Sequence, residues 1–335
     1  MLKIGYKASA EQFGPTDLLE FAVLAETLGW DSVWVSDHFQ PFRHTDGHAP
    51  SSIPLLGALG ARTERVVFGT SVLTPTFRYH PAIVAHSFAT LGVLFPNRVV
   101  LGLGTGESLN EVPATDLTWP EQKERTARFR EAVNLIKLLW TSPRVTFEGR
   151  YYRTRNATIY DLPQTLPPIF IAAAGPIMAR LAASEGEGLI CTSGKRWELY
   201  SETLLPAVEA GLAASEGARS QAFERTIEMK VSFDPDRDRA MRETLFWSAL
   251  ALTPEEKMNV EDPREMQELA QSLSLERSAS RWIVTTDAEE MAERVGAYLK
   301  LGFNHLVFHS PAPDQARFLR LFSQHVIPIL RSRFA

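Results

Sequence analysis

The chain has 335 residues, of which 44% are hydrophobic and 22% charged, and its formal net charge is −5. This composition is typical of a globular soluble protein, and it lacks the basic surplus of a nucleic-acid binder. The single cysteine, Cys191, excludes an internal disulfide and fits a reducing compartment. No apolar run approaches the roughly 20 residues of a membrane helix, and no leader sequence is evident. We therefore expect a cytoplasmic protein with no membrane or nucleic-acid partner.

Segments with strand patterns and segments with helix patterns alternate along most of the chain. Apolar runs predict strands at 2–8, 32–38, 66–73, 99–103, 169–174, 188–192, 227–233 and 305–309. Amphipathic stripes predict helices at 18–28, 81–94, 129–140 and 312–330, and turn residues within 145–160 indicate a small hairpin. About eight βα units close a TIM barrel. Apolar strands without polar alternation also suit a parallel sheet covered on both faces. The sequence therefore predicts an α/β protein with a (β/α)8 barrel.

One segment, at about 235–287, breaks this rhythm. It is rich in Glu, Arg, Met and Ser, and we expect it to add helices between the seventh and eighth strands. No internal repeat and no linker rich in Pro or Ser divides the chain. We therefore predict a single domain over 1–335 that carries this insertion.

The second strand ends in the adjacent pair Asp37 and His38. Ligands of α/β proteins bind at the carboxyl ends of the strands, so an acid and an imidazole there are candidate site residues. The alternative is a structural strand end, in which Asp37 accepts hydrogen bonds from loop amides. Glu11 after the first strand and Glu107 after the fourth strand add two carboxylates at the same edge.

Small residues follow the fourth and fifth strands. The run 102–107 is not a dinucleotide motif, because Glu107 stands where that motif has its third glycine. It is either a tight strand exit or backbone placed against a flat ligand. The run 172–176 leads into a helix whose first N–H groups suit a phosphate. Close packing of that helix on the sheet explains the same small residues equally well.

Three cations lie far apart along the chain. Lys195 follows the sixth strand, whereas Lys257 and Arg281 belong to the insertion. They meet only if the insertion folds over the barrel mouth. Phe42 and Trp247 are candidates for stacking near the same pocket.

Two other patterns do not indicate a functional site. His44 and His48 flank an Asp-Gly pair, but the prolines and glycine around them disfavour the helix that would bring the two rings together. We therefore expect no metal site. The pair Ser193 and Gly194 lacks the strand–turn–helix context of a nucleophile elbow, so serine hydrolysis finds little support.

Several ordered segments resemble one known family. They are Gly5-Tyr-Lys-Ala-Ser-Ala-Glu11-Gln-Phe, Val35-Ser-Asp-His38-Phe-Gln-Pro, Gly69-Thr-Ser-Val-Leu-Thr-Pro-Thr-Phe-Arg-Tyr, Gly104-Thr-Gly-Glu107, Ile190-Cys-Thr-Ser-Gly-Lys195 and Arg281-Trp-Ile-Val. Together they resemble the deazaflavin-dependent glucose-6-phosphate dehydrogenases over essentially the whole chain. The resemblance implies a luciferase-like TIM barrel, a homodimer, and oxidation of a sugar 6-phosphate with coenzyme F420 as the hydride acceptor.

The resemblance also implies roles for individual residues. Those implied to contact the deazaflavin and its tail are Asp37, Thr74, Thr105, Gly106 and Asn110, and those implied to hold its phosphate-bearing chain are Ala174, Gly175, Ile177 and Met178. A cis peptide bond is implied between Ser71 and Val72, behind the flat ring. The residues implied to form the sugar-phosphate pocket are Thr192, Lys195, Lys257 and Arg281, with Phe42 beside them. Gathered in this way, the three cations suit a phosphate dianion.

The implied reaction assigns proton transfer to three side chains. His38 is the candidate base for the C1 hydroxyl, because an imidazole pKa of about 6.5 suits that proton. Glu107 is the candidate to protonate, or hydrogen-bond, the deazaflavin near N1 if a buried setting raises its pKa. Glu11 is a further candidate for proton transfer. The immediate product is a 6-phospho-lactone.

Two positions depart from the mycobacterial-type enzymes of this family. Phe42 stands where those enzymes have tryptophan, and Met258 stands where they have histidine. We therefore expect the same reaction type with acceptance of other 6-phosphosugars. Two alternatives remain: an FMN- or F420-dependent luciferase-like oxidoreductase or monooxygenase with another substrate, and a non-catalytic deazaflavin-binding protein. Cofactor binding tests the first alternative, and turnover tests the second.

Overall fold

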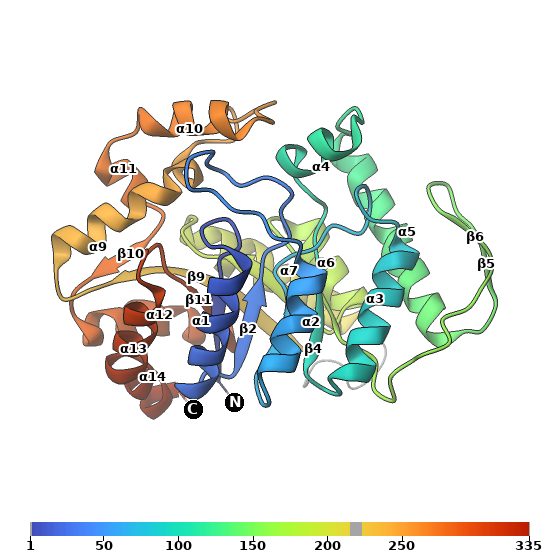
Figure 1. Ribbon diagram of the computed structural model, residues 1–335, viewed down its shortest axis with the longest axis horizontal. Coiled ribbons are helices and arrows are strands. Elements are labelled where there is room, and N and C mark those ends of the chain that lie inside the picture. The colour runs from blue at the N-terminus through green and yellow to red at the C-terminus, as the bar shows by residue number, and fades with distance from the viewer. Residues whose placement is uncertain (1, 215–222, 335) are drawn as a thin grey trace.

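The computed structural model describes residues 2–214 and 223–334. Its central element is a closed barrel of parallel strands, which confirms the predicted (β/α)8 fold (Figure 1). The strands in barrel order are β1 (Lys3–Ala8), β2 (Ser32–Val35), β3 (Val67–Thr70), β4 (Val99–Leu103), β7 (Ile169–Ala172), β8 (Gly188–Thr192), β9 (Glu224–Phe233) and β11 (His305–His309). The barrel closes because β11 pairs with both β9 and β1.

Helices surround the barrel on its outside (Figure 1). They are α1 (Pro15–Thr27), α2 (Ser52–Arg62), α3 (Pro81–Leu94), α5 (Gln122–Thr141), α6 (Pro176–Glu185), the π-helical turn η1 (Leu199–Leu204) leading into α7 (Leu205–Ala213), α12 (Ala288–Leu301), α13 (Gln315–His325) and α14 (Ile327–Phe334). The stripe that predicts α1 is its buried face, with Leu18, Ala22 and Ala25 against the barrel. Proline at the first position of α1, α3 and α6 fits a site where no N–H is needed.

The core has two layers. Inside the barrel, Trp34 stacks on Phe170, and Val100, Ile190 and Val307 complete the filling. A larger layer lies between the strands and the helices. Burying each of these large side chains contributes about 1.5–3 kcal/mol, so the filled barrel is a rigid support for residues at its rim.

The insertion follows β9 and lies at the end of the barrel opposite the chain termini (Figure 1). It contains α9 (Arg237–Glu243), η2 (Thr244–Ala251), α10 (Pro263–Gln271) and α11 (Leu275–Ala279). It also contains β10 (Ile283–Thr285), a strand absent from the prediction, which pairs with β9. The insertion has its own apolar cluster, which includes Leu252 and Met266 and reaches Leu109 of α4 (Ser108–Thr115).

Several predicted bounds differ from the observed ones; the strands predicted at 32–38 and 169–174, for example, end at Val35 and Ala172. The strand predicted at 66–73 ends at Thr70, after which the Ser71–Val72 peptide bond is cis and Leu73 pairs with Leu103. The helix predicted at 312–330 is two helices separated at Val326, because Pro328 has no N–H to continue the first helix. The hairpin is present as β5 (Val145–Glu148) and β6 (Arg153–Ala157). Among the described residues, no helix is long and apolar enough to cross a membrane.

Candidate active site

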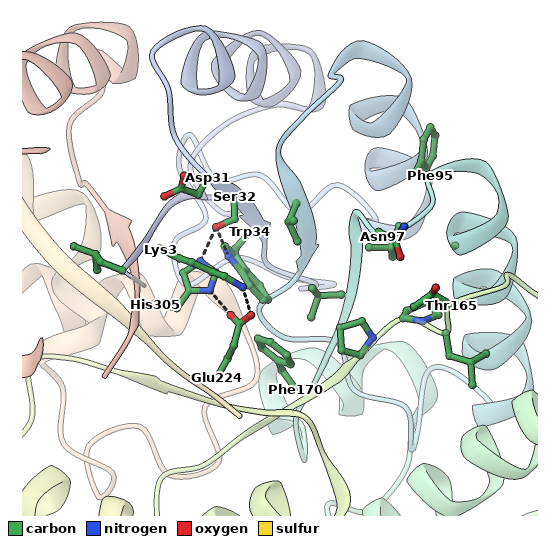
Figure 2. A pocket seen from close by; sticks show the side chains of 18 residues that line it. Lys3, Asp31, Ser32, Trp34, Phe95, Asn97, Thr165, Phe170, Glu224 and His305 are labelled. Atoms are coloured by element: carbon green, nitrogen blue, oxygen red, sulfur yellow. Dashed lines mark hydrogen bonds and ion pairs between the residues drawn. The ribbon is translucent and has the colours of Figure 1, made fainter. Parts of the chain in front are cut away.

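A cavity of about 390 Å³ opens at the amino ends of the strands, and several of its polar groups are paired with one another. Figure 2 shows Lys3, Ser32, Glu224 and His305 pointing toward one another there. The Ser32 Oγ lies 2.7 Å from His305 Nε2, and His305 Nδ1 lies 2.9 Å from Glu224 Oε2. Trp34 Nε1 donates to the same Ser32 Oγ. Satisfied groups at this end of a TIM barrel indicate a structural role.

A larger cavity, of about 540 Å³, lies at the carboxyl ends of the strands. Every site residue named from the sequence lines it: Glu11, Asp37, His38, Phe42, Ser71, Val72, Thr74, Thr105, Gly106, Glu107, Asn110, Ala174, Gly175, Ile177, Met178, Thr192, Lys195, Lys257 and Arg281. These residues come from strand ends and from the insertion. The fold therefore brings them to one place, which is the candidate active site.

The three cations meet on one side of this cavity, and we call Lys195, Lys257 and Arg281 the cation cluster. Gly194 has a φ of +75°, and a Cβ at this position would lie 2.4 Å from the backbone oxygen of Arg281. The loop that carries Lys195 is therefore pressed against Arg281. Partial burial, followed by the charges of Arg281, Lys257 and Lys230, lowers the pKa of Lys195 to about 8. Such crowding of like charges favours an anionic ligand.

His38 and Glu11 form an acid–imidazole pair on the other side. The His38 Nδ1 lies 3.2 Å from Glu11 Oε1, and Ser36 Oγ donates to Glu11 Oε2 at 2.7 Å. Burial raises the pKa of Glu11, but nearby His38 and Lys7 and the Ser36 hydrogen bond together lower it below its ordinary value. The distance fits an ion pair, but Nδ1 of His38 makes no hydrogen bond among the described residues. The charge of an ionised Glu11 nevertheless favours a hydrogen on Nδ1, which leaves Nε2 as the basic nitrogen. The Phe42 ring packs edge-on against His38, with centroids 5.1 Å apart.

A wall of small residues lies between these two sides. It is formed by Gly104 and Gly106 after β4 and by 172–175 at the end of β7, and the first residues of α6 continue it. Gly106 has a φ of +84°, a conformation that glycine adopts at little cost. The small side chains let a flat ring approach the backbone. The start of α6 offers its free N–H groups to a phosphate.

Asp37 and Asn110 hold the rim of the cavity together. The Asp37 carboxylate accepts hydrogen bonds from Ser52 Oγ at 2.6 Å and from Arg78 Nη2 at 2.9 Å. Its main partners therefore belong to the protein, as in the structural alternative described above. Asn110 Oδ1 accepts from the backbone N–H groups of Phe39 and Gln40 at 2.8 and 3.1 Å. The protein thus uses the oxygen of this amide to position the loop that follows His38.

The structure does not bury Glu107, which was the condition attached to its acid role. This residue is the N-cap of α4 and is exposed at the cavity rim, so the protein alone does not supply the burial on which its proposed acid role depends. Thr192 is exposed as well, and its backbone oxygen accepts from Tyr200 Oη at 2.8 Å.

Sequence reasoning missed four buried residues at the bottom of this cavity: Lys7, Glu228, Lys230 and His309. The available signal was the alternation of Glu228 and Lys230 with Ile227, Met229 and Val231, which puts both charges on the same face of the strand. Charged side chains are almost never fully buried unless they are paired.

A model of the luciferase-like monooxygenase family matches residues 2–305. The chain belongs to this family. A relative from Nakamurella multipartita, named F420-dependent glucose-6-phosphate dehydrogenase, is 59% identical over 331 residues, which cover 99% of this chain and 97% of the relative. A relative of the same name from Mycolicibacterium smegmatis is 54% identical over 332 residues, with 98% of each chain covered.

Solved structures agree with this membership. An F420-dependent secondary alcohol dehydrogenase, in complex with an F420–acetone adduct, superposes with a TM-score of 0.91 at 34% identity over 98% of this chain and 99% of that one. A coenzyme F420-dependent tetrahydromethanopterin reductase from Methanopyrus kandleri has a TM-score of 0.80 at 19% identity, covering 98% and 99% of the two chains. The second likeness supports the barrel fold alone.

Proposed function

We propose that this chain oxidises glucose 6-phosphate, or a related 6-phosphosugar, at C1 to the 6-phospho-lactone, with hydride transfer to C5 of coenzyme F420. The observation that carries the proposal is the presence of the cation cluster and the His38–Glu11 pair in one cavity. The names of relatives at 54–59% identity support the same substrate and cofactor. Two of the three cations come from the insertion, so the substrate pocket requires the insertion to pack over the mouth of the barrel.

The wall of small residues fits coenzyme F420. We assign the deazaflavin and its tail to the residues that the resemblance implied, namely Asp37, Ser71, Val72, Thr74, Thr105, Gly106 and Asn110, and the phosphate-bearing chain to Ala174, Gly175, Ile177 and Met178. When bound, the cofactor supplies a hydride acceptor at C5. An exposed Glu107 at the rim is available to hydrogen-bond the edge of this ring once the ring covers it.

The side chains have complementary tasks in this reaction. Lys195, Lys257 and Arg281 bind the phosphate and so fix the position of C1 relative to His38. Nε2 of His38 accepts the proton of the C1 hydroxyl as the hydride leaves C1. Ionised Glu11, 3.2 Å from Nδ1, orients the imidazole through its charge, as a carboxylate does in other acid–imidazole pairs.

The test is a panel of sugars assayed with F420 by the loss of the oxidised deazaflavin absorbance. We expect turnover of glucose 6-phosphate and none of unphosphorylated glucose at equal concentration. Equal rates for both sugars would contradict the role of the cation cluster. Fluorescence titration with FMN and with F420 tests the monooxygenase alternative, and F420 binding without turnover of any 6-phosphosugar would favour the non-catalytic alternative.

Three further assignments accompany this proposal: one domain, a homodimer and a cytoplasmic location. The family resemblance supports the dimer, and exposed Ile83 and Leu94 on α3 are apolar surface that a second copy would cover. Light scattering of the purified protein tests the dimer. The single cysteine supports a reducing compartment, and fractionation of cells that express the chain tests its location.

A further inference from the structure

Four buried polar residues form the bottom of the cavity and take no part in the phosphate binding or proton transfer proposed above. They are Lys7 on β1, Glu228 and Lys230 on β9, and His309 on β11, and we call them the floor network. Their exposed fractions are 4%, 8%, 3% and 2%. Burying four titratable groups costs free energy unless they form ion pairs and hydrogen bonds with one another or with a ligand.

The strand order puts the floor network directly under a bound substrate. The order around the barrel is β8, β9, β11, β1 and β2, and His309 is in register with Lys230. Lys195 follows β8, whereas His38 follows β2. A molecule whose phosphate lies on the cation cluster and whose C1 lies at His38 must therefore cross the ends of β9, β11 and β1. Its ring hydroxyls then lie over the floor network.

Glu228 is the centre of the floor network. One of its oxygens lies 3.2 Å from His309 Nδ1 and 3.1 Å from Lys230 Nζ, and the other lies 3.5 Å from Lys7 Nζ. Lys7 Nζ also donates to the backbone oxygen of Ser71 at 2.6 Å. Burial raises the pKa of Glu228, but the two ammonium groups and His309 hold it well below its ordinary value. Glu228 is therefore a carboxylate and can only accept hydrogen bonds.

This carboxylate determines which nitrogen of His309 carries the hydrogen. Because Glu228 only accepts, Nδ1 of His309 must donate to it. Burial lowers the pKa of His309 more than Glu228 raises it, so the imidazole is neutral near pH 7. A neutral imidazole with its hydrogen on Nδ1 presents a bare lone pair at Nε2.

The Nε2 atom of His309 is buried and has no hydrogen-bond partner among the described residues. The ring is held edge-on by Trp247 and Trp282, with centroids at 4.6 and 5.0 Å. Trp247 is itself fixed by donation from its Nε1 to Gln12 Oε1 at 2.9 Å. A buried acceptor without a donor is unfavourable, and a hydroxyl from a ligand would remove that cost. Since the residue lines the cavity, the ligand can supply this hydroxyl.

We propose that Nε2 of His309 accepts a hydrogen bond from a ring hydroxyl of the substrate other than that at C1, which makes His309 a specificity-determining residue. This inference rests on the proposed function. Glu228 acts through His309 as a positioning residue, because it holds the hydrogen on Nδ1. Phosphosugars that lack the recognised hydroxyl leave Nε2 unpaired and are discriminated against.

The test compares glucose 6-phosphate with its 2-deoxy, 3-deoxy and 4-deoxy analogues in the wild type and in His309→Phe. Phenylalanine keeps a ring between the two tryptophans but has no acceptor. We expect one analogue to lose about 5- to 100-fold in kcat/KM with the wild type, the range for one lost hydrogen bond. With His309→Phe, that analogue and glucose 6-phosphate become equivalent. His86→Phe, an exposed change on α3, is the matched control and keeps the wild-type discrimination.

Two further measurements need no turnover. Calorimetric titration of each variant with the same four sugars gives their Kd values, which should follow the same pattern. The ¹⁵N chemical shift of His309 Nε2 in histidine-labelled wild type should change on saturation with glucose 6-phosphate. It should not change with the analogue that lacks the recognised hydroxyl. This measurement uses the wild type, so it tests the inference even if His309→Phe fails to fold. Wild-type discrimination retained by His309→Phe, or a signal that never moves, would overturn the inference alone. A wild type that reduces F420 with no phosphosugar would overturn the proposed function as well.

Discussion

The charge of Lys195 is the feature of the cation cluster that pH can remove. Its pKa is lowered to about 8 by partial burial and by Arg281, Lys257 and Lys230. The ammonium is therefore present below pH 8 and lost as the pH rises through that value. The phosphate of the substrate, with a second pKa of about 6, remains a dianion over the same interval. We expect the affinity for 6-phosphosugars to fall as the pH rises above 8.

The size of the effect follows from the fraction of protonated Lys195. With a pKa of about 8, roughly nine molecules in ten carry the charge at pH 7 and roughly one in ten at pH 9. If only the charged form binds phosphate, the Kd for glucose 6-phosphate rises about tenfold over this interval. Lys195→Arg keeps its charge throughout, because guanidinium does not lose its proton in this range. Its Kd should therefore stay nearly constant.

Calorimetric titration with glucose 6-phosphate between pH 6.5 and 9.5, at constant ionic strength, measures the effect directly. Lys137→Arg serves as the control, because Lys137 pairs with Glu185 on the surface, away from the cavity. This control should follow the wild type. A wild-type Kd that does not change with pH, or a Lys195→Arg curve parallel to that of the wild type, would refute the assignment of Lys195 to the phosphate.

Three other substitutions test separate parts of the site. His38→Ala should lower kcat by about 10²- to 10⁴-fold, as expected for a lost general base, while the calorimetric Kd for glucose 6-phosphate changes little; an unchanged kcat would exclude His38 as the base. Gly106→Ala should cost about 1–2 kcal/mol in urea unfolding, because its φ is +84° and the new Cβ would lie 3.0 Å from Thr74 Cγ2. The same variant should weaken F420 in fluorescence titration, and wild-type values in both assays would contradict this account of the wall. Phe42→Trp adds an indole N–H beside His38 and should raise the preference for glucose 6-phosphate over other 6-phosphosugars about fivefold, measured as a ratio of kcat/KM values; an unchanged ratio would remove Phe42 from the specificity argument.

The barrel was predictable because apolar strands and amphipathic helices alternate so regularly. The β4 strand matches its predicted bounds, since valines and leucines on both faces suit a strand covered on both sides. Local breaks were harder to predict. The early end of β3 at Thr70 depends on a peptide geometry that apolar patterning does not encode. The short β10 forms because β9 offers an edge beside it, which is a tertiary effect.

The residues that line the site were predictable from the family resemblance. The buried contacts that orient them were not predictable from the sequence. Lys195, Lys257 and Arg281 line one cavity although Lys195 and Arg281 lie 86 positions apart along the sequence. By contrast, the partner of Asp37 is Arg78, which no local pattern links to it. His309 closes an apolar strand and reads from the sequence as a strand end, so the Glu228 that orients it is visible only in three dimensions.

The small-residue wall and the cation cluster come from different parts of the sequence. The small-residue wall comes from the exits of β4 and β7, whereas Lys257 and Arg281 come from one later stretch that has an apolar cluster of its own. Substitutions in that stretch change the substrate side of the cavity directly, whereas they reach the small-residue wall through the packing on Leu109 of α4. Two of the three cations of the substrate pocket are therefore encoded within about 50 contiguous codons, whereas the small-residue wall is encoded elsewhere.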